Sequence, residues 1–312
     1  MTVLAGKHVL LTGAYGFIGQ ALLARLQEET GTRLIVLSRS PRAPAMDGIT
    51  HVAAPLQQLT RQIWDHAGIR RIDLVLHLGA FTPKTGAEAD QWEPVFRDNL
   101  EGTRRLLESL PSVPERIVFA STLDVYAPTA DGESLDESSP TDPQGLYGAS
   151  KLFCEHLVRA YARRTACGYA ILRYGHIFGP GEERYGKLIP SSIRAIMRGE
   201  PPTVYGDGSA LRDLLYVSDA VEATMRAATS ADVALGPVNI VRGASVPIRE
   251  VVETLVQVMD FRQGINFVEG PPGRSLRFSN QKMKDAIGEW PLVSLEDGLR
   301  REVAYFKSGV SL

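Results

Sequence analysis

The sequence predicts an α/β protein with a doubly wound parallel sheet, followed by a smaller α/β region towards the C-terminus. Short apolar runs rich in β-branched residues alternate with helical stretches through the first two thirds of the 312 residues. Such runs are typical of strands buried on both faces, and their alternation with helices predicts right-handed crossovers. After about residue 175 the pattern becomes irregular.

Each expected element follows from the local pattern of apolar and turn residues. Buried strands are predicted at 8–13, 33–38, 73–79, 116–121 and 169–175. Helices are predicted where apolar residues recur at helical spacing, at 17–29, 91–109 and 146–166, and again near 217–229, 247–259 and 281–288. The stretches 179–190 and 198–213 are rich in glycine, proline and charge, which predicts loops around a ligand.

Composition and charge exclude several classes of protein. Hydrophobic residues make up 44% and charged residues 22%, as in ordinary soluble globular proteins. The formal charge of −2 offers no basic excess for nucleic acid, and no apolar run approaches the roughly 20 residues of a membrane span. Cys154 and Cys167 are too few for a disulfide framework or a thiolate metal site. The first apolar run is short and leads into glycines, unlike a signal peptide, so we expect a cytoplasmic protein without a metal.

A glycine-rich turn follows the first expected strand. Gly13, Gly16 and Gly19 lie between that strand and the helix expected at 17–29. Glycine allows a tight turn and close approach of a pyrophosphate to the backbone, while the helix N-terminus favours its negative charge. This context predicts a dinucleotide-binding site.

The end of the second expected strand bears on the choice of cofactor. An acidic residue there would accept hydrogen bonds from the adenosine ribose 2′-OH. The chain has Ser38 and Arg39 instead. This strand end therefore lacks a carboxylate that would repel a 2′-phosphate, and it offers a guanidinium that can pair with one. We therefore expect NADP, with NAD as the alternative.

A tyrosine and a lysine share one face of the helix expected at 146–166. Tyr147 and Lys151 are four residues apart. A free phenol has a pKa of about 10, and a neighbouring ammonium, helped by the nicotinamide cation, is expected to lower that value. The pair gains weight because a strand ending in Ser121 and Thr122 precedes it. The set predicts acid–base chemistry beside a dinucleotide.

These elements, in this order, resemble the extended short-chain dehydrogenase/reductase family, specifically its NAD(P)-dependent nucleotide-sugar epimerase/dehydratase branch. The resemblance covers nearly the whole chain. Its motifs are TGAYGFIG (12–19), HLGA (77–80), NLEGT (99–103), ASTLDVYA (120–127), LYGASK (146–151), LRYGHIFGPG (172–181), VYGDGSALRDLLYVSDA (204–220) and SLEDGL (294–299). It implies a Rossmann-type dinucleotide-binding domain at 1–175, to which about 212–242 returns, and a mainly substrate-binding region at 176–312.

The resemblance also implies roles for individual residues. Thr122 would hydrogen-bond the substrate oxygen that is oxidised or reduced, Tyr147 would exchange its proton, and Lys151 would hold the cofactor ribose. The positions that would line the dinucleotide are Phe17, Ile18, Leu78, Gly79, Ala80 and Asn99. A homodimer through the helices at 91–109 and 146–166 is a further expectation from the family.

The same resemblance predicts a nucleotide-diphosphate sugar as substrate. The motif around Arg212 matches the family loop whose arginine binds the diphosphate, and Arg274 or Arg277 is a candidate second arginine. Lys187 and Leu188 lie where relatives contact the nucleotide.

Four positions depart from the family pattern. Ala54 and Pro55 occupy the region after the third strand where relatives place an Asp near the adenine. His176 stands where many relatives carry an asparagine near the sugar, and Gly175 replaces a bulkier residue. These changes suggest a pocket adapted to an unusual sugar. His176 is interpreted as a hydrogen-bonding pocket residue, with acid–base action as the alternative.

The residues after Thr122 bear on the reaction. In dehydratases of the family, adjacent Asp and Glu follow the catalytic threonine, whereas this chain has Leu123 and Asp124. Leucine cannot protonate a leaving group, so a 4,6-dehydratase is disfavoured, and Asp124 is left to contact the sugar. We expect NADPH-dependent reduction of a 4-keto nucleotide-diphosphate sugar, with a 4-epimerase as the alternative. A catalytically silent dinucleotide-binding protein is less favoured, because Thr122, Tyr147 and Lys151 are all present.

Overall fold

A central parallel sheet organises the molecule. The computed structural model describes residues 4–39, 48–84, 88, 91–129, 133–183, 185–270, 273 and 275–309. The sheet's strands are β1 (His8–Thr12), β2 (Arg33–Ser38), β3 (Ile49–Ala53), β4 (Leu74–His77), β5 (Arg116–Thr122), β7 (Gly168–Tyr174) and β11 (Ala234–Ile240). Their order in space is β11-β7-β5-β4-β1-β2-β3, and every neighbouring pair is parallel.

The strand order reverses between β1 and β4. From β1 the chain builds outward through β2 and β3, and it then returns to place β4, β5 and β7 on the other side of β1. This is the Rossmann arrangement, in which ligands bind at the carboxyl ends of the strands beside the reversal. The predicted fold class is confirmed.

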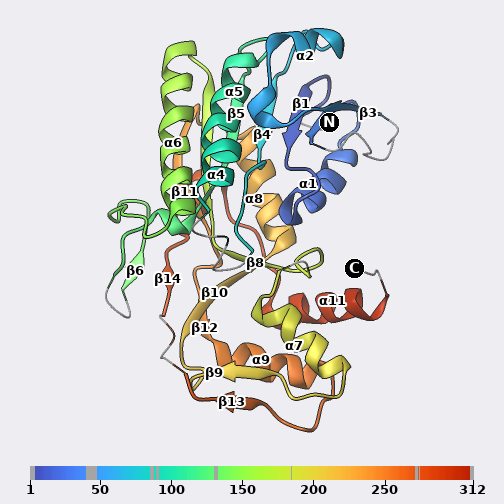
Figure 1. Cartoon of the computed structure of the whole chain (residues 1–312), viewed down its shortest axis with the longest axis vertical. Coiled ribbons are helices and arrows are strands. Elements are labelled where there is room, and N and C mark those ends of the chain that lie inside the picture. The colour runs from blue at the N-terminus through green and yellow to red at the C-terminus, as the bar shows by residue number, and fades with distance from the viewer. Residues whose placement is uncertain are drawn as a thin grey trace.

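Helices cover both faces of this sheet (Figure 1). On one face lie α1 (Phe17–Gln27) and α8 (Val217–Thr229), and on the other lie α2 (Arg61–His66), α5 (Gly102–Ser109) and α6 (Leu146–Thr165). Alternate residues of β1 pack into the two apolar cores: Val9 and Leu11 contact the first, and Leu10 contacts the second. Burial on both faces explains why these strands read as continuous apolar runs.

The C-terminal part adds small sheets and helices, most of which occupy the lower half of Figure 1, whereas the helix at Gln281–Ile287 packs against β11 and α8. A three-stranded sheet joins β12 (Ser245–Pro247), β10 (Leu211–Tyr216) and β8 (His176–Phe178), and two strand pairs join β13 (Asn266–Val268) to β9 (Thr203–Tyr205) and β14 (Arg277–Phe278) to β6 (Ser134–Leu135). The accompanying helices are α7 (Leu188–Met197), α9 (Ile248–Val258), α10 (Gln281–Ile287) and α11 (Leu295–Lys307). No helix in the described part of the chain has the length and apolarity needed to span a bilayer.

Short helical segments complete the main domain. The segment η1 (Leu56–Gln58) follows β3, and η3 (Leu123–Val125) follows β5. The helix predicted at 91–109 consists of α4 (Trp92–Pro94), a π-helical stretch η2 (Val95–Glu101) and α5. The wider π turn matters for the site, because η2 contributes Asp98 and Asn99 to its surroundings.

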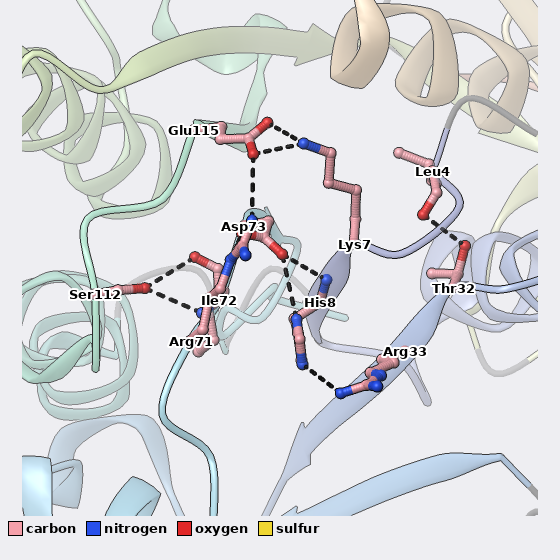
Figure 2. A network of polar contacts seen from close by, with 10 residues as sticks. All are labelled: Leu4, Lys7, His8, Thr32, Arg33, Arg71, Ile72, Asp73, Ser112 and Glu115. Atoms are coloured by element: carbon pink, nitrogen blue, oxygen red, sulfur yellow. Dashed lines mark hydrogen bonds and ion pairs between the residues drawn. The ribbon is translucent and has the colours of Figure 1, made fainter.

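A polar network ties together the strands at their amino ends (Figure 2). Asp73, which is buried just before β4, accepts hydrogen bonds from the backbone N–H of His8 at 2.8 Å and from the Arg71 guanidinium. Burial alone would raise the pKa of Asp73, but the hydrogen bonds from His8 and Arg71 lower it below the ordinary value. Lys7 pairs with Glu115 at 2.5 Å in the same network. These contacts hold β1, β4 and β5 in register.

Candidate active site

A cavity of about 950 Å³ opens at the carboxyl ends of the strands beside the reversal of strand order. Its walls come from the turn after β1, the end of β2, the loop after β4, the end of β5 and the start of α6. The predicted site residues on these walls are Gly13, Gly16, Phe17, Ile18, Gly19, Ser38, Arg39, Leu78, Gly79, Ala80, Thr122, Asp124, Tyr147, Lys151 and Lys187. The fold thus brings together most of the residues that the sequence singled out.

The glycine turn after β1 has no room for side chains. Gly13 has a φ of +74°, and a Cβ there would lie 2.7 Å from the backbone nitrogen of Gly79. A Cβ on Gly19 would lie 2.0 Å from the carbonyl oxygen of Gly13. Glycine therefore lets the start of α1 approach the sheet, where its free backbone N–H groups favour an anion. This cradle fits the pyrophosphate of a dinucleotide.

Buried hydrogen bonds fix the loop after β4. Thr12 Oγ1 accepts from the backbone N–H of Gly79 at 2.9 Å, and it lies 2.8 Å from His77 Nδ1. His77 Nε2 in turn lies 3.0 Å from Thr103 Oγ1. Burial and the positive charge of Lys151 lower the pKa of His77 to about 3, so this imidazole is neutral at pH 7. It holds the cavity wall and does not exchange protons.

Asn99 lies behind the cavity wall. Its amide donates to Ser150 Oγ at 2.9 Å and to the Phe81 carbonyl at 3.2 Å, and its oxygen accepts from the Phe81 N–H at 2.7 Å. Asn99 is buried, and it is absent from the described lining of the cavity. Its amide joins the loop that follows β4 to α6 beside Lys151. The structure therefore places Asn99 as a support for the site, whereas the sequence suggested a lining position.

The end of β2 meets a carboxylate from another element. Arg39 Nη1 lies 3.4 Å from Asp98 Oδ2, and Arg97 Nε pairs with the same carboxylate at 2.8 Å. All three residues line the cavity. The NADP expectation considered only the end of the strand, where no carboxylate is present. Asp98 supplies one from η2, so the ribose end of the cavity holds an acid as well as two guanidinium groups.

The predicted catalytic hydroxyl lies where β5 ends. Thr122 Oγ1 accepts a hydrogen bond from the Asp124 N–H at 3.2 Å and donates one to Asp124 Oδ2 at 3.1 Å. A Cβ on Gly148 would lie 2.3 Å from the carbonyl oxygen of Asp124, so the first turn of α6 rests directly on this segment. That contact places Tyr147 next to Thr122 and Asp124.

The tyrosine is held as a phenol by the chain itself. Burial first, and then the negative charge of Asp124, raise the pKa of Tyr147, and a hydrogen bond with Thr82 lowers it only in part. The expected lowering by Lys151 together with a nicotinamide cation stays a prediction, because the chain alone carries no such cation. The buried Lys151 ammonium lies 4.4 Å from the Phe119 ring centroid, and burial lowers its pKa to about 8.

The side chains of Leu123 and Asp124, the two residues after Thr122, lie in different surroundings. Leu123 packs in an apolar cluster with Val125, Val241 and Phe278. Asp124 reaches the cavity, where it keeps contact with solvent, and the protein atoms around it raise the pKa of its carboxyl. The position that a dehydratase uses for an acid is therefore filled by a core residue.

Gly175 explains how that leucine fits. A Cβ at this position would lie 2.9 Å from Val241 Cγ1 and 3.1 Å from Leu123 Cδ1. Gly175 also lines the large cavity, so the prediction of a pocket adapted to an unusual sugar stays a prediction. The missing side chain makes room for Leu123 as well, so the two departures from the family pattern share one packing arrangement.

The remaining predicted substrate residues lie further out. His176 begins β8 next to β10, with its register partner Leu214 two residues from Arg212, so His176 and Arg212 share one face of this small sheet. Burial of the imidazole first, and then the charges of Arg212 and Lys187, lower the pKa of His176 to about 4, although the residue keeps an exposed edge. It is neutral at pH 7, which favours the hydrogen-bonding role.

Two other candidates lie away from the cavity wall. Leu188 begins α7, and the exposed Arg277 begins β14, where it pairs with Ser134 of β6. Neither belongs to the described lining of the large cavity. Arg274 lies outside the described residues.

Several cavity residues were not predicted from the sequence. They are Thr82, Asp98 and Tyr185, together with Thr12 and the buried His77 behind it. His77 stands in the HLGA motif, and Asp98 directly precedes the predicted Asn99. Proximity to these motifs was therefore an available signal, but contact between η2 and β2 depends on the tertiary fold.

Comparison with known proteins gives consistent matches over the whole chain. The model described as the NAD dependent epimerase/dehydratase family matches residues 9–241. A dTDP-glucose 4,6-dehydratase of Neisseria gonorrhoeae is 29% identical over 334 residues, covering 96% of this chain and 95% of that protein. A UDP-N-acetyl-alpha-D-glucosaminuronate decarboxylase of Bacillus cytotoxicus is 31% identical, covering 96% and 98%.

A solved structure gives a further match. The protein MoeE5, in complex with UDP-glucuronic acid and NAD, superposes with a TM-score of 0.84 at 29% identity. The alignment covers 97% of this chain and 100% of MoeE5. The chain is thus similar in sequence and fold, over nearly its whole length, to a protein solved with a nicotinamide dinucleotide.

Proposed function

Because the chain belongs to the NAD dependent epimerase/dehydratase family, we propose that it oxidises and re-reduces C4 of a nucleotide-diphosphate sugar, with 4-epimerisation as the overall reaction. The observation that carries the proposal is the convergence of Thr122, Tyr147 and Lys151 at one end of the cavity that begins at the glycine turn. A proton-exchanging phenol beside a dinucleotide cradle is the arrangement that alcohol–ketone interconversion requires.

A nicotinamide dinucleotide, when bound, would supply the hydride acceptor and donor, as well as a positive ring beside Tyr147. Its pyrophosphate would lie on the turn of Gly13, Gly16 and Gly19, and Lys151 would reach its ribose. Tyr147 would take the C4 hydroxyl proton during oxidation and return it during reduction. Thr122 would hold the C4 oxygen by turning its hydroxyl proton from Asp124 Oδ2, which lies 3.1 Å away, towards the substrate.

The surroundings of Thr122 favour epimerisation over dehydration. Loss of water needs an acid for the departing hydroxyl, and Leu123 packs in a core cluster at that position. The lone Asp124 is left to orient Thr122 and to contact a sugar hydroxyl. An epimerase needs only the C4 chemistry that Thr122 and Tyr147 can perform.

The choice of cofactor separates the epimerase from a second candidate, the NADPH-dependent 4-ketoreductase. Arg39 and Arg97 favour a 2′-phosphate, and NADPH would then support net reduction. Asp98, which pairs with both arginines, can instead accept a hydrogen bond from a free ribose 2′-OH. MoeE5 was solved with NAD, which supports NAD. We therefore place the NAD-linked epimerase first and keep the NADP-linked reductase as the alternative.

The test combines cofactor titration with a substrate panel. NAD and NADP are titrated against the protein and against Arg39→Ala, and the protein is then incubated with UDP- and dTDP-hexoses and their 4-keto forms. An epimer formed without net change in NADH or NADPH absorbance supports the epimerase. Stoichiometric loss of NADPH with a 4-keto sugar establishes the reductase instead. If neither an epimer nor a reduced sugar forms, or if no dinucleotide binds, the proposal is rejected.

A homodimer accompanies this proposal. Trp92 and Phe96 on the segment before α5, and Phe153 on α6, are 65%, 50% and 52% exposed. Large apolar side chains in this position, on the two helices that the family resemblance named, suit a self-complementary interface. Light scattering should give twice the chain mass, and Phe153→Glu should shift it to the monomer; a monomeric native protein contradicts the dimer.

A further inference from the structure

Two fully buried glutamates lie close to Lys187, one of the lysines that line the cavity. Glu182 follows β8 in the loop that leads to α7, and Glu302 lies on α11. They are 1% and 0% exposed. Buried carboxyls are rare unless they are paired or protonated. The proposed C4 chemistry does not use either group, so their retention needs another explanation.

Close packing brings α11 against this loop. A Cβ on Gly298 of α11 would lie 2.6 Å from the Phe178 ring at the end of β8. Gly181 has a φ of +103°, and a Cβ there would lie 3.2 Å from the Phe17 ring. The loop is thus held between the C-terminal helix and the glycine turn of the dinucleotide site.

One cation serves several carboxyls. Glu182 Oε2 pairs with Lys187 Nζ at 3.2 Å. The other oxygen of Glu182, one oxygen of Glu183 and both oxygens of Glu302 are buried and meet no hydrogen-bond donor among the described residues. The three carboxyls are not arranged to hold a metal ion within the described ranges. Two buried carboxylates in contact cannot both stay ionised beside a single ammonium.

A proton on Glu302 removes the repulsion between the carboxylates of Glu182 and Glu302. With a proton, Glu302 donates a hydrogen bond to Glu182, and the contact between the two carboxyls becomes attractive. Burial first, and then the charge of Glu182, raise the pKa of Glu302 to about 9, so it is neutral at pH 7. The titratable groups that face Glu302 are Glu182, Glu183 and Lys187 from the loop and Tyr216 from the end of β10.

The Lys187 side chain, which pairs with Glu182, lines the cavity. The Lys187 side chain is 44% exposed, and its ammonium lies 5.6 Å from the Phe17 ring centroid and 5.1 Å from that of Tyr185. It also lowers the pKa of His176, which places its charge beside the predicted diphosphate region. Glu182 therefore holds Lys187 at the point where an anionic ligand would meet it.

We propose that Glu302 is a positioning residue, which shares one proton with Glu182 and through it fixes Lys187 for the phosphates of the nucleotide-sugar substrate. The identity of the ligand rests on the proposed function, whereas the shared proton does not. When Glu302 loses its proton, two carboxylates compete for Lys187 and the ammonium is drawn from the cavity. The C-terminal helix thereby takes part in substrate binding.

The first experiment tests the shared proton by thermal unfolding of the full chain between pH 5 and pH 9. The pKa of Glu302 is raised in the folded state, so its contribution to stability is present at low pH and is lost as the pH rises towards about 9. Relative to Glu302→Gln, which cannot ionise, the native protein should therefore lose Tm steadily across this range. Glu296→Gln, an exposed control on the same helix, should give a constant difference. A constant difference for Glu302→Gln would overturn the shared proton.

The second experiment tests the action through Lys187 by calorimetric titration with UDP at pH 7. Glu302→Gln keeps a neutral donor and should bind UDP within about twofold of the native protein, whereas Glu302→Ala and Lys187→Met should each weaken binding about tenfold. In a Lys187→Met background, Glu302→Ala should have no further effect, since the two act in series. Additive losses would show that Glu302 acts by another route and would overturn the positioning role.

A ligand-free measurement separates this inference from the proposed function. The rate at which an amine-reactive reagent modifies Lys187, followed by mass spectrometry, should rise in Glu302→Ala and stay unchanged in Glu302→Gln. If the native protein does not bind UDP but this pattern holds, the substrate class fails and the positioning role stands. Equal labelling rates in all three proteins would reject the positioning role, even if UDP binds.

Discussion

The two ends of the parallel sheet use charged residues in opposite ways. At the amino ends of the strands, Asp73 is surrounded by donors, and Lys7 pairs with Glu115. At the carboxyl ends, Asp124 reaches a cavity and has its pKa raised, while burial lowers the pKa of Lys151 to about 8. Among the described residues, Asp73 at the first end has its pKa lowered by donors of the chain, whereas Asp124 and Lys151 at the second end have pKa values shifted towards their neutral forms.

This difference separates stability from chemistry. Polar groups that are paired in the folded state add stability, and perturbed groups around a cavity are typical of functional sites. Substitutions at the amino end should therefore change the free energy of unfolding and leave turnover intact. Substitutions at the carboxyl end should do the reverse.

Tyr147→Phe should give the largest effect. The variant keeps the buried ring and loses the group that exchanges the C4 proton, so turnover should fall by about 10²–10⁴. Dinucleotide binding and Tm should stay near the native values. Steady-state kinetics with the substrate found in the panel, and fluorescence titration of the cofactor, measure both. Tyr205→Phe, at an exposed tyrosine on β9, is the matched control, and near-native turnover in Tyr147→Phe would refute the assignment.

Thr122→Val should come next. Valine has the shape of threonine and removes the hydroxyl that would hold the C4 oxygen, so turnover should fall by about 10²-fold. The hydroxyl also accepts from the Asp124 N–H, and this lost contact should cost only a small part of the stability. A variant with native kcat but lower Tm would show that Thr122 is a structural end of β5.

Asp73→Asn should lower stability and spare activity. Asparagine cannot satisfy the donors of His8 and Arg71 as a carboxylate does, so the free energy of unfolding should fall by about 1–3 kcal/mol. The lowered pKa means that Asp73 contributes above the unfolded value of about 3.9 and that its contribution is lost as the pH falls through the folded value. The difference between the two proteins should therefore shrink from pH 6 to pH 3 in urea unfolding.

The exposed partner in the same network gives the control. Glu115 is 56% exposed in its side chain, so Glu115→Gln should change the free energy of unfolding by less than about 1 kcal/mol. If Glu115→Gln destabilised as much as Asp73→Asn, the burial of Asp73 would not be the cause. A loss of turnover in Asp73→Asn would remove the contrast between the two ends of the sheet.

Much of the main sheet could be predicted from local sequence, although β3 and β11 were not among the expected strands. Buried strands read as continuous apolar runs, and the five expected strands coincide with β1, β2, β4, β5 and β7. The glycine turn and the pair of Tyr147 and Lys151 depend on spacing along one turn or helix, which the sequence displays directly. These features were accessible because each is set by residues close in the chain.

Features that depend on contacts between residues far apart in the chain could not be predicted from the sequence. Asp98 and Arg39 belong to segments far apart in the sequence, and only the contact between η2 and β2 shows that they form an ion pair. The packing of Leu123 beside Gly175 could not be predicted either, because the two residues follow different strands. The rise in the pKa of Tyr147 that burial and Asp124 cause also depends on groups that only the tertiary fold brings together.

The last strand of the sheet has a consequence for synthesis on the ribosome. β11 pairs with β7 along its whole length, but residues 175–233 separate them in the chain. Until this intervening segment and β11 have been translated, β7 presents an open, apolar edge that can pair with another nascent chain. The first 174 residues therefore leave one edge of β7 unpaired, and that edge is covered only by residues up to 240.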